Sequence, residues 1–114
     1  MKPEDVVRAE SAAWHGLDVD AIVGHFDPDG VWDNVALGAH RGHAEIRAAV
    51  EGYVRRMESA ELRLVNIAVN GHVVLTERID EMVYDGNKIT ARCMGAFEVK
   101  DDKIVAWRDY FDVP

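Results

Sequence analysis

The second half of the chain consists of four stretches in which apolar and polar residues alternate, separated by short turn sequences. These stretches are rich in β-branched side chains and cover residues 61–69, 72–84, 88–99 and 104–113. The pairs Asn70-Gly71, Asp85-Gly86 and Asp101-Asp102 between them are typical of tight hairpins. We therefore predict a four-stranded antiparallel meander, and a sheet of this kind needs an apolar cover on one face.

Helical periodicity dominates the first half of the chain and predicts that cover. Apolar residues recur every three or four positions in residues 4–15 and again in residues 44–57, as in amphipathic helices. A shorter apolar pattern, residues 21–26, follows Asp20 as the expected N-cap and is expected to end at Pro28. The sequence thus predicts three helices ahead of the sheet.

One short strand is expected among these helices, followed by a loop. Residues 30–37 read as strand-like, and residues 38–42 form the expected loop. With 114 residues, the chain has room for one hydrophobic core, so residues 1–114 are predicted to form a single α+β domain. In it a curved, mainly antiparallel sheet wraps around N-terminal helices, and any deep pocket lies within the core itself.

The charge of the chain excludes several classes of partner. It carries 21 acidic and 13 basic residues, a formal net charge of −8, and has no basic run. Nucleic acid and anionic membranes are therefore not expected partners. No apolar stretch approaches the length of a membrane span, and Cys93, the only cysteine, cannot form an internal disulfide. We expect a cytoplasmic protein.

Two charged residues share one face of the expected strand 72–84. Because side chains alternate along a strand, Arg78 and Asp80 point the same way as Val74 and Met82. The strand therefore places an ion pair among apolar neighbours.

The last expected strand places a carboxylate in a similar setting. Asp109 shares a face with Val105, Trp107 and Phe111. A carboxylate among large apolar side chains is costly unless it is paired. The planar guanidinium of Arg78 can bridge two carboxylates at once, and Asp80 and Asp109 are the two available if their faces meet.

Such an arrangement would suit general acid–base catalysis. Two carboxylates around one arginine in a dry site favour a single shared proton, so that one serves as acid and the other as base. The alternative is that Arg78 and Asp80 form a solvated pair on an exposed face and that Asp109 is a surface aspartate.

Trp32 and Asn34 share a face of residues 30–37. Together they can hold a small polar molecule; the alternative is that Trp32 is a core residue and Asn34 a turn residue.

The chain resembles the limonene-1,2-epoxide hydrolase family, a branch of the cone-shaped folds similar to nuclear transport factor 2 (NTF2-like, SnoaL-like). The resemblance spans nearly the whole chain. Its most specific parts are the segments TERID (76–80), MGAFEV (94–99) and KIVAWRDYFD (103–112), supported by WDN (32–34). It implies an NTF2-like cone and an epoxide hydrolase that works without cofactor or metal.

The resemblance also implies a role for each polar residue. Asp109 would deprotonate the attacking water, and Asp80 would protonate the oxygen of a small, apolar, cyclic or terpene-like epoxide. Arg78 would hold both carboxylates, and Asn34 would orient the water. Trp32 stands where the family has a water-binding tyrosine, and its indole can donate a hydrogen bond but cannot accept one. The product would be a vicinal diol, formed in one step without a covalent intermediate.

Matching to the family further implies which residues line the pocket, although these residues also fit an ordinary core. They are Ser11, Trp14, Tyr53, Met57, Met82, Ala91, Cys93 and Phe111. A homodimer packed through the outer sheet face is implied as well. Two other functions fit the same fold: a ketosteroid-isomerase-like or polyketide-cyclase-like enzyme, and a non-catalytic protein that binds a small ligand.

Overall fold

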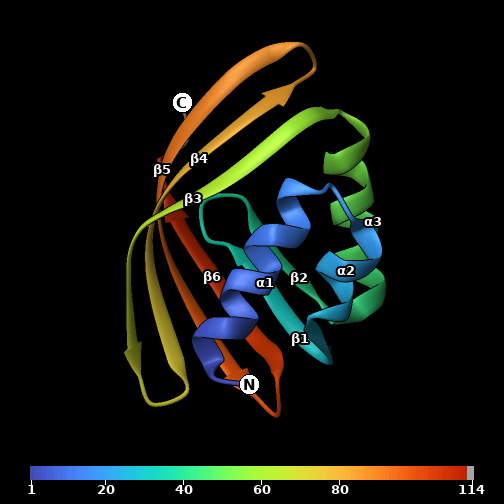
Figure 1. Ribbon diagram of the computed structural model, residues 1–114. Helices are drawn as coiled ribbons and strands as arrows, with labels where there is room; N and C mark the ends of the chain where they lie inside the picture. The colour runs from blue at the N-terminus through green and yellow to red at the C-terminus, as the bar shows by residue number, and fades with distance from the viewer. Residues whose placement is uncertain (113–114) are drawn as a thin grey trace.

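A curved six-stranded sheet bends around three helices in the computed structural model, which describes residues 1–112 (Figure 1). In chain order the elements are α1 (Pro3–His15), α2 (Val19–Gly24), β1 (Phe26–Asn34), β2 (Gly38–Arg41), α3 (Gly42–Arg55), β3 (Met57–Asn70), β4 (Val73–Tyr84), β5 (Asn87–Lys100) and β6 (Lys103–Phe111). None of the helices in this range is both long and apolar enough to cross a membrane.

The strand order β2-β1-β6-β5-β4-β3 confirms the predicted meander, because β3 to β6 are successive antiparallel neighbours. Asp85 and Gly86 both have positive φ, 52° and 78°, as a two-residue hairpin turn requires. The sheet is mixed, since β1 pairs with β6 in parallel. That pairing sets Asn34 directly beside Asp109, although 75 positions separate them in the sequence.

The bounds of α2 and the start of β1 differ from the sequence prediction. Asp18 rather than Asp20 caps α2, because its Oδ1 accepts a hydrogen bond from the Ala21 amide at 3.1 Å. The helix ends at Gly24, and Pro28 lies inside β1. A proline is tolerated there because the register between β1 and β6 is interrupted between Phe26 and Val31, where no ladder bond to β6 is lost.

The expected loop at residues 38–42 is also a correction, because most of it forms the edge strand β2. Its four residues pair with the end of β1 in an antiparallel hairpin. The segment is short and largely exposed, so it carries no alternation of apolar and polar residues that would predict a strand.

A bulge in β6 corrects the predicted face of that strand. Glu98 pairs with Ala106 while Val99 pairs with Ile104, so β6 holds one extra residue, Val105. In a regular strand, side chains on the same face are an even number of positions apart. Because of the bulge, Ile104 and Trp107 are both buried although they are three positions apart. Val105 is only half-buried and does not continue the face of Trp107. The expected end of this strand, Val113, lies outside the described residues.

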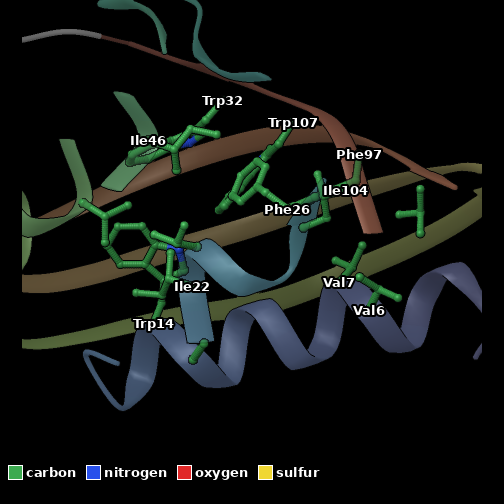
Figure 2. Packing of buried hydrophobic residues seen from close by; sticks show 14 of the residues in the cluster. Val6, Val7, Trp14, Ile22, Phe26, Trp32, Ile46, Phe97, Ile104 and Trp107 are labelled. Atoms are coloured by element: carbon green, nitrogen blue, oxygen red, sulfur yellow. The ribbon is translucent and has the colours of Figure 1, made fainter. Parts of the chain in front are cut away.

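The hydrophobic core lies between the helices and the inner face of the sheet. Figure 2 shows Val6, Val7 and Trp14 of α1 facing the strands that carry Phe97 and Trp107. The rings of Phe97 and Trp107 stack with their centroids 4.6 Å apart. This stacking fixes the buried ring of Trp107, two residues before Asp109.

Candidate active site

The three charged residues that the sequence singles out meet on the inner face of the sheet. The guanidinium of Arg78 donates to Asp80 from Nε (3.0 Å to Oδ1) and from Nη2 (2.8 Å to Oδ2). It also donates to Asp109 from Nη1 (3.0 Å to Oδ1) and from Nη2 (2.8 Å to Oδ2). Arg78 is 2%, Asp80 8% and Asp109 6% exposed, so this is a buried double bidentate array and not a solvated surface pair.

The charge of Arg78 is permanent in this setting. Burial alone would lower the pKa of its guanidinium, but the hydrogen bonds and negative charges of Asp80 and Asp109 raise it above the ordinary arginine value. One fixed positive charge therefore faces two carboxylates in a dry environment. With both carboxylates ionised, the array would carry one uncompensated negative charge.

Trp107 adds a contact that the sequence did not predict. Its indole Nε1 donates to Oδ1 of Asp109 at 2.6 Å, and both groups are buried. The signal for this contact was the i, i+2 spacing of Trp107 and Asp109, which places both on one strand face. Asp109 therefore accepts three hydrogen bonds, whereas Asp80 accepts two.

Gly95 is a second site residue that sequence reasoning missed. It lies on β5, opposite Thr76 on β4 and Asp109 on β6. A Cβ at this position would lie 2.7 Å from Nη1 of Arg78, 2.8 Å from Oδ1 of Asp109 and 2.8 Å from the Thr76 hydroxyl. A glycine inside a strand pattern often marks such a close approach, and only glycine leaves room here for the ion pair to cross β5.

The two candidate residues of β1 reach the same region. Asn34 is buried beside Asp109 through the parallel pairing of β1 and β6. Trp32 is buried against the rings of Trp14 and Trp107, at centroid distances of 5.6 and 5.9 Å. Its indole nitrogen has no hydrogen-bond partner among the described residues. Both β1 side chains thus lie in the wall that faces the carboxylates.

A cavity of about 240 Å³ opens onto the array, and its wall is mainly apolar. Asn34, Arg78, Asp80 and Asp109 are polar groups in that wall. The apolar part contains most of the residues that the resemblance implied: Trp14, Tyr53, Met57, Met82, Ala91 and Phe111. It also contains Trp32, which the sequence had already singled out, and the residues Leu37, Ala60, Leu62, Ile89 and Trp107, which were not predicted to line a pocket. Asp112 is a further polar residue of the wall that was not predicted.

Ser11 and Cys93 are not among the residues that line this cavity. Ser11 is buried within the packing of α1. Cys93 lies next to the guanidinium, with Nη2 of Arg78 at 3.3 Å from its Sγ, so the arginine occupies the space in front of it. Burial raises the pKa of the Cys93 thiol to about 12, so it is a neutral group at physiological pH.

A candidate metal cluster is formed by Asp80, Cys93 and Asp109, but Arg78 already occupies its centre. Ligand atoms of Asp80, Cys93 and Asp109 lie within 4.8 Å of one another. Nη2 of Arg78 contacts all three, at 2.8, 3.3 and 2.8 Å. The cation that this cluster holds is therefore the guanidinium, and a metal ion would have to displace it.

The fold and the site together define a class of protein: a small cone-shaped α+β domain in which two aspartates bound to one arginine lie in the wall of an apolar cavity. The chain belongs to the family described as limonene-1,2-epoxide hydrolase catalytic domain, whose model matches residues 1–114. Membership of this family supports epoxide hydrolysis in general, and it confirms the family expected from the sequence.

Individual relatives agree with this family. The epoxide hydrolase EphG of Mycobacterium tuberculosis is 33% identical over 110 residues, which cover 94% of this chain and 71% of EphG. The structure of an M. tuberculosis LEH-like epoxide hydrolase has a TM-score of 0.87 at 30% identity and covers 96% of this chain and 82% of its own. A SnoaL-like polyketide cyclase from Shewanella denitrificans has a TM-score of 0.89 at 11% identity, over 96% and 90% of the two chains, and supports the fold alone.

Proposed function

We propose that the chain adds water to a small, apolar, cyclic or terpene-like epoxide and releases a vicinal diol. The observation that carries this proposal is the buried Asp80–Arg78–Asp109 array at the end of an apolar cavity. An apolar wall favours a hydrocarbon-like substrate, and the cavity of about 240 Å³ suits a small one. The polar end provides both proton transfers that ring opening by water needs.

The proposed reaction is a single concerted step. Asp109, as the carboxylate, takes a proton from a water molecule whose oxygen forms the new bond to a ring carbon. The carbon–oxygen bond of the ring breaks, and the proton of Asp80 passes to the oxygen that is released. The protein gains one proton at Asp109 and loses one at Asp80, so its charge is unchanged. The proton then returns to Asp80 before the next turnover.

Asn34 and Trp32 are proposed to hold the attacking water. Asn34 lies beside Asp109, and its amide offers both a donor and an acceptor. The unpartnered indole N–H of Trp32 can donate to the water oxygen. Arg78 acts only through its fixed charge and geometry, and neither a metal nor a cofactor takes part in this mechanism.

The arginine between the two carboxylates favours this proposal over isomerase chemistry on the same fold. A ketosteroid isomerase also uses a second aspartate, but as a protonated donor to the carbonyl oxygen, and that role needs no arginine that ties it to the base. The test is incubation with a panel of terpene and cyclic epoxides, with diols measured by chiral gas chromatography. We expect diol from the unchanged protein, formed at least about 100-fold more slowly by Asp109→Asn. A folded wild-type protein that opens no epoxide in the panel would overturn the proposal.

We also propose that residues 1–114 act as one domain and that the protein works in the cytoplasm. Two copies are proposed to associate there through the outer face of the sheet. Val65, Met94 and Tyr110 are exposed there around a shallow depression. Light scattering after size exclusion should give twice the mass of the chain, and Met94→Glu should give the monomer. A monomeric wild-type protein would contradict this association.

A further inference from the structure

The two carboxylates around Arg78 are not equivalent. Each accepts two hydrogen bonds from the guanidinium, with donor–acceptor distances between 2.8 and 3.0 Å. Only Asp109 accepts a further one, from the indole of Trp107 at 2.6 Å. A donor aimed at a carboxylate stabilises the ionised form, and it does so most strongly where water is excluded. The third donor is therefore the feature that distinguishes the two members of the pair.

We propose that Trp107 is a positioning residue that makes Asp109 the ionised base and leaves the shared proton on Asp80. The inference rests on the proposed function and deepens it, because it assigns the direction of proton transfer from geometry. Without the indole N–H, Arg78 would offer each carboxylate the same two hydrogen bonds, at 2.8 and 3.0 Å.

The same contacts identify the oxygen of Asp109 that accepts the proton. Oδ1 already accepts hydrogen bonds from Nη1 of Arg78, at 3.0 Å, and from the indole Nε1 of Trp107, at 2.6 Å. The backbone of Gly95 lies against it, since a Cβ on that residue would be 2.8 Å away. Oδ2 accepts a hydrogen bond from Nη2 of Arg78 and from no second nitrogen among the described residues. Oδ2 is therefore the atom that takes the proton from water.

The indole is held in place by the core. Trp107 stacks on Phe97 at 4.6 Å and on Phe26 at 6.1 Å between centroids, and the Arg78 guanidinium carbon lies 5.6 Å from its ring centre. By contrast, the indole nitrogens of Trp14 and Trp32 have no partner among the described residues. Trp14 therefore provides the comparison for the loss of an N–H that bonds nothing, whereas the N–H of Trp32 is the one proposed to bind the attacking water.

Few charged groups face Asp109 besides its partners in the array. Arg78 and Asp80 face it from β4, and Cys93 faces it from β5 as a neutral thiol. From β1 the facing side chain is the uncharged amide of Asn34. The cavity wall holds one further carboxylate, Asp112, which is exposed, so the buried pair is expected to govern the acid side of the pH–rate profile.

The first test is the pH–rate profile of Trp107→Phe, which keeps an aromatic ring but removes the donor. Loss of a hydrogen bond to a charged group should raise the pH of half-maximal kcat on the acid side by about one unit, because Asp109 becomes harder to ionise. The effect should fall on kcat more than on KM. Trp14→Phe, which loses an unpartnered N–H, should leave that pH unchanged. A folded Trp107→Phe variant with the wild-type profile would overturn the proposal.

The second test uses the unmodified protein and needs no activity. Its three tryptophans give three indole N–H signals in a ¹⁵N-labelled sample. One should lie at low field, exchange slowly and move as the pH crosses the acid limb, and it should persist in Trp14→Phe and Trp32→Phe. If none of the three signals moves with pH, the proposal is wrong. A moving signal without any diol product would refute the hydrolase function but not the contact.

Discussion

Replacing Gly95 by alanine perturbs the site through a single methyl group. The new Cβ would lie 2.7 Å from Nη1 of Arg78 and 2.8 Å from Oδ1 of Asp109, closer than real Cβ contacts. Neither atom can move away freely, because Asp109 is also held by Trp107 and Arg78 by both carboxylates. The substitution therefore separates the base from the arginine that holds it.

The cost can be worked out from these contacts. The Nη1–Oδ1 hydrogen bond is lost or lengthened, which costs about 1.5–3 kcal/mol for a bond between charged groups. Overpacking a dense interior adds about 1–3 kcal/mol. We expect the free energy of unfolding to fall by about 3 kcal/mol, near the lower end of the sum of these two terms, because the structure partly relaxes. A displacement of the base by a sizeable fraction of an ångström should lower kcat/KM about 100-fold.

The assay is urea unfolding followed by tryptophan fluorescence, together with diol formation from the best epoxide of the panel. Gly52→Ala is the matched control, since a Cβ at this position in α3 meets nothing within 4 Å. Alanine there should stabilise the helix by about 0.5–1 kcal/mol without any loss of rate. The reasoning is refuted if Gly95→Ala retains wild-type stability and kcat/KM.

Three further predictions follow from the same structure. Asp109→Asn and Asp80→Asn should each lower kcat by about 10²–10⁴-fold while circular dichroism stays unchanged, and near-full activity in either would remove that residue from its role. Trp32→Tyr should raise the rate by restoring a hydroxyl that can both donate and accept, and an unchanged or lower rate would mean that the indole serves the site in its own right. Burial, opposed by the hydrogen bond to His25, raises the pKa of Glu10 to about 7 from an ordinary value of 4.5. Because this group binds its proton more tightly when folded, wild-type stability should fall relative to Glu10→Gln by about 3 kcal/mol as the pH rises from 4.5 to 7, and parallel urea stability curves for the two proteins would contradict this.

Local chemistry explains which parts of the fold the sequence predicts. The Asp85-Gly86 turn and the alternation along residues 72–84 depend only on neighbouring residues, so β4 and its hairpin were predictable. The bulge at Val105 depends on how β6 pairs with β5, and nothing in the local pattern records it. The edge strand β2 is too short and exposed to carry a pattern of its own.

The site was predictable to a similar extent. Arg78, Asp80 and Asp109 were conspicuous as charges on otherwise apolar strand faces, and β5 brings those faces together. The contact of Trp107 with Asp109 depends on the rotamer of a core ring, and the need for Gly95 depends on register between three strands. Such contacts become visible only in three dimensions.

A single-turnover reaction in ¹⁸O-labelled water, with the protein in excess over epoxide, distinguishes water activated by Asp109 from direct attack by its carboxylate. If Asp109 activates water, every diol molecule formed in this first turnover carries one labelled oxygen, and mass spectrometry finds no label in the peptide that contains Asp109. Unlabelled diol accompanied by label in that peptide would mean that the carboxylate itself attacks the ring. The absence of any diol would contradict epoxide hydrolysis altogether.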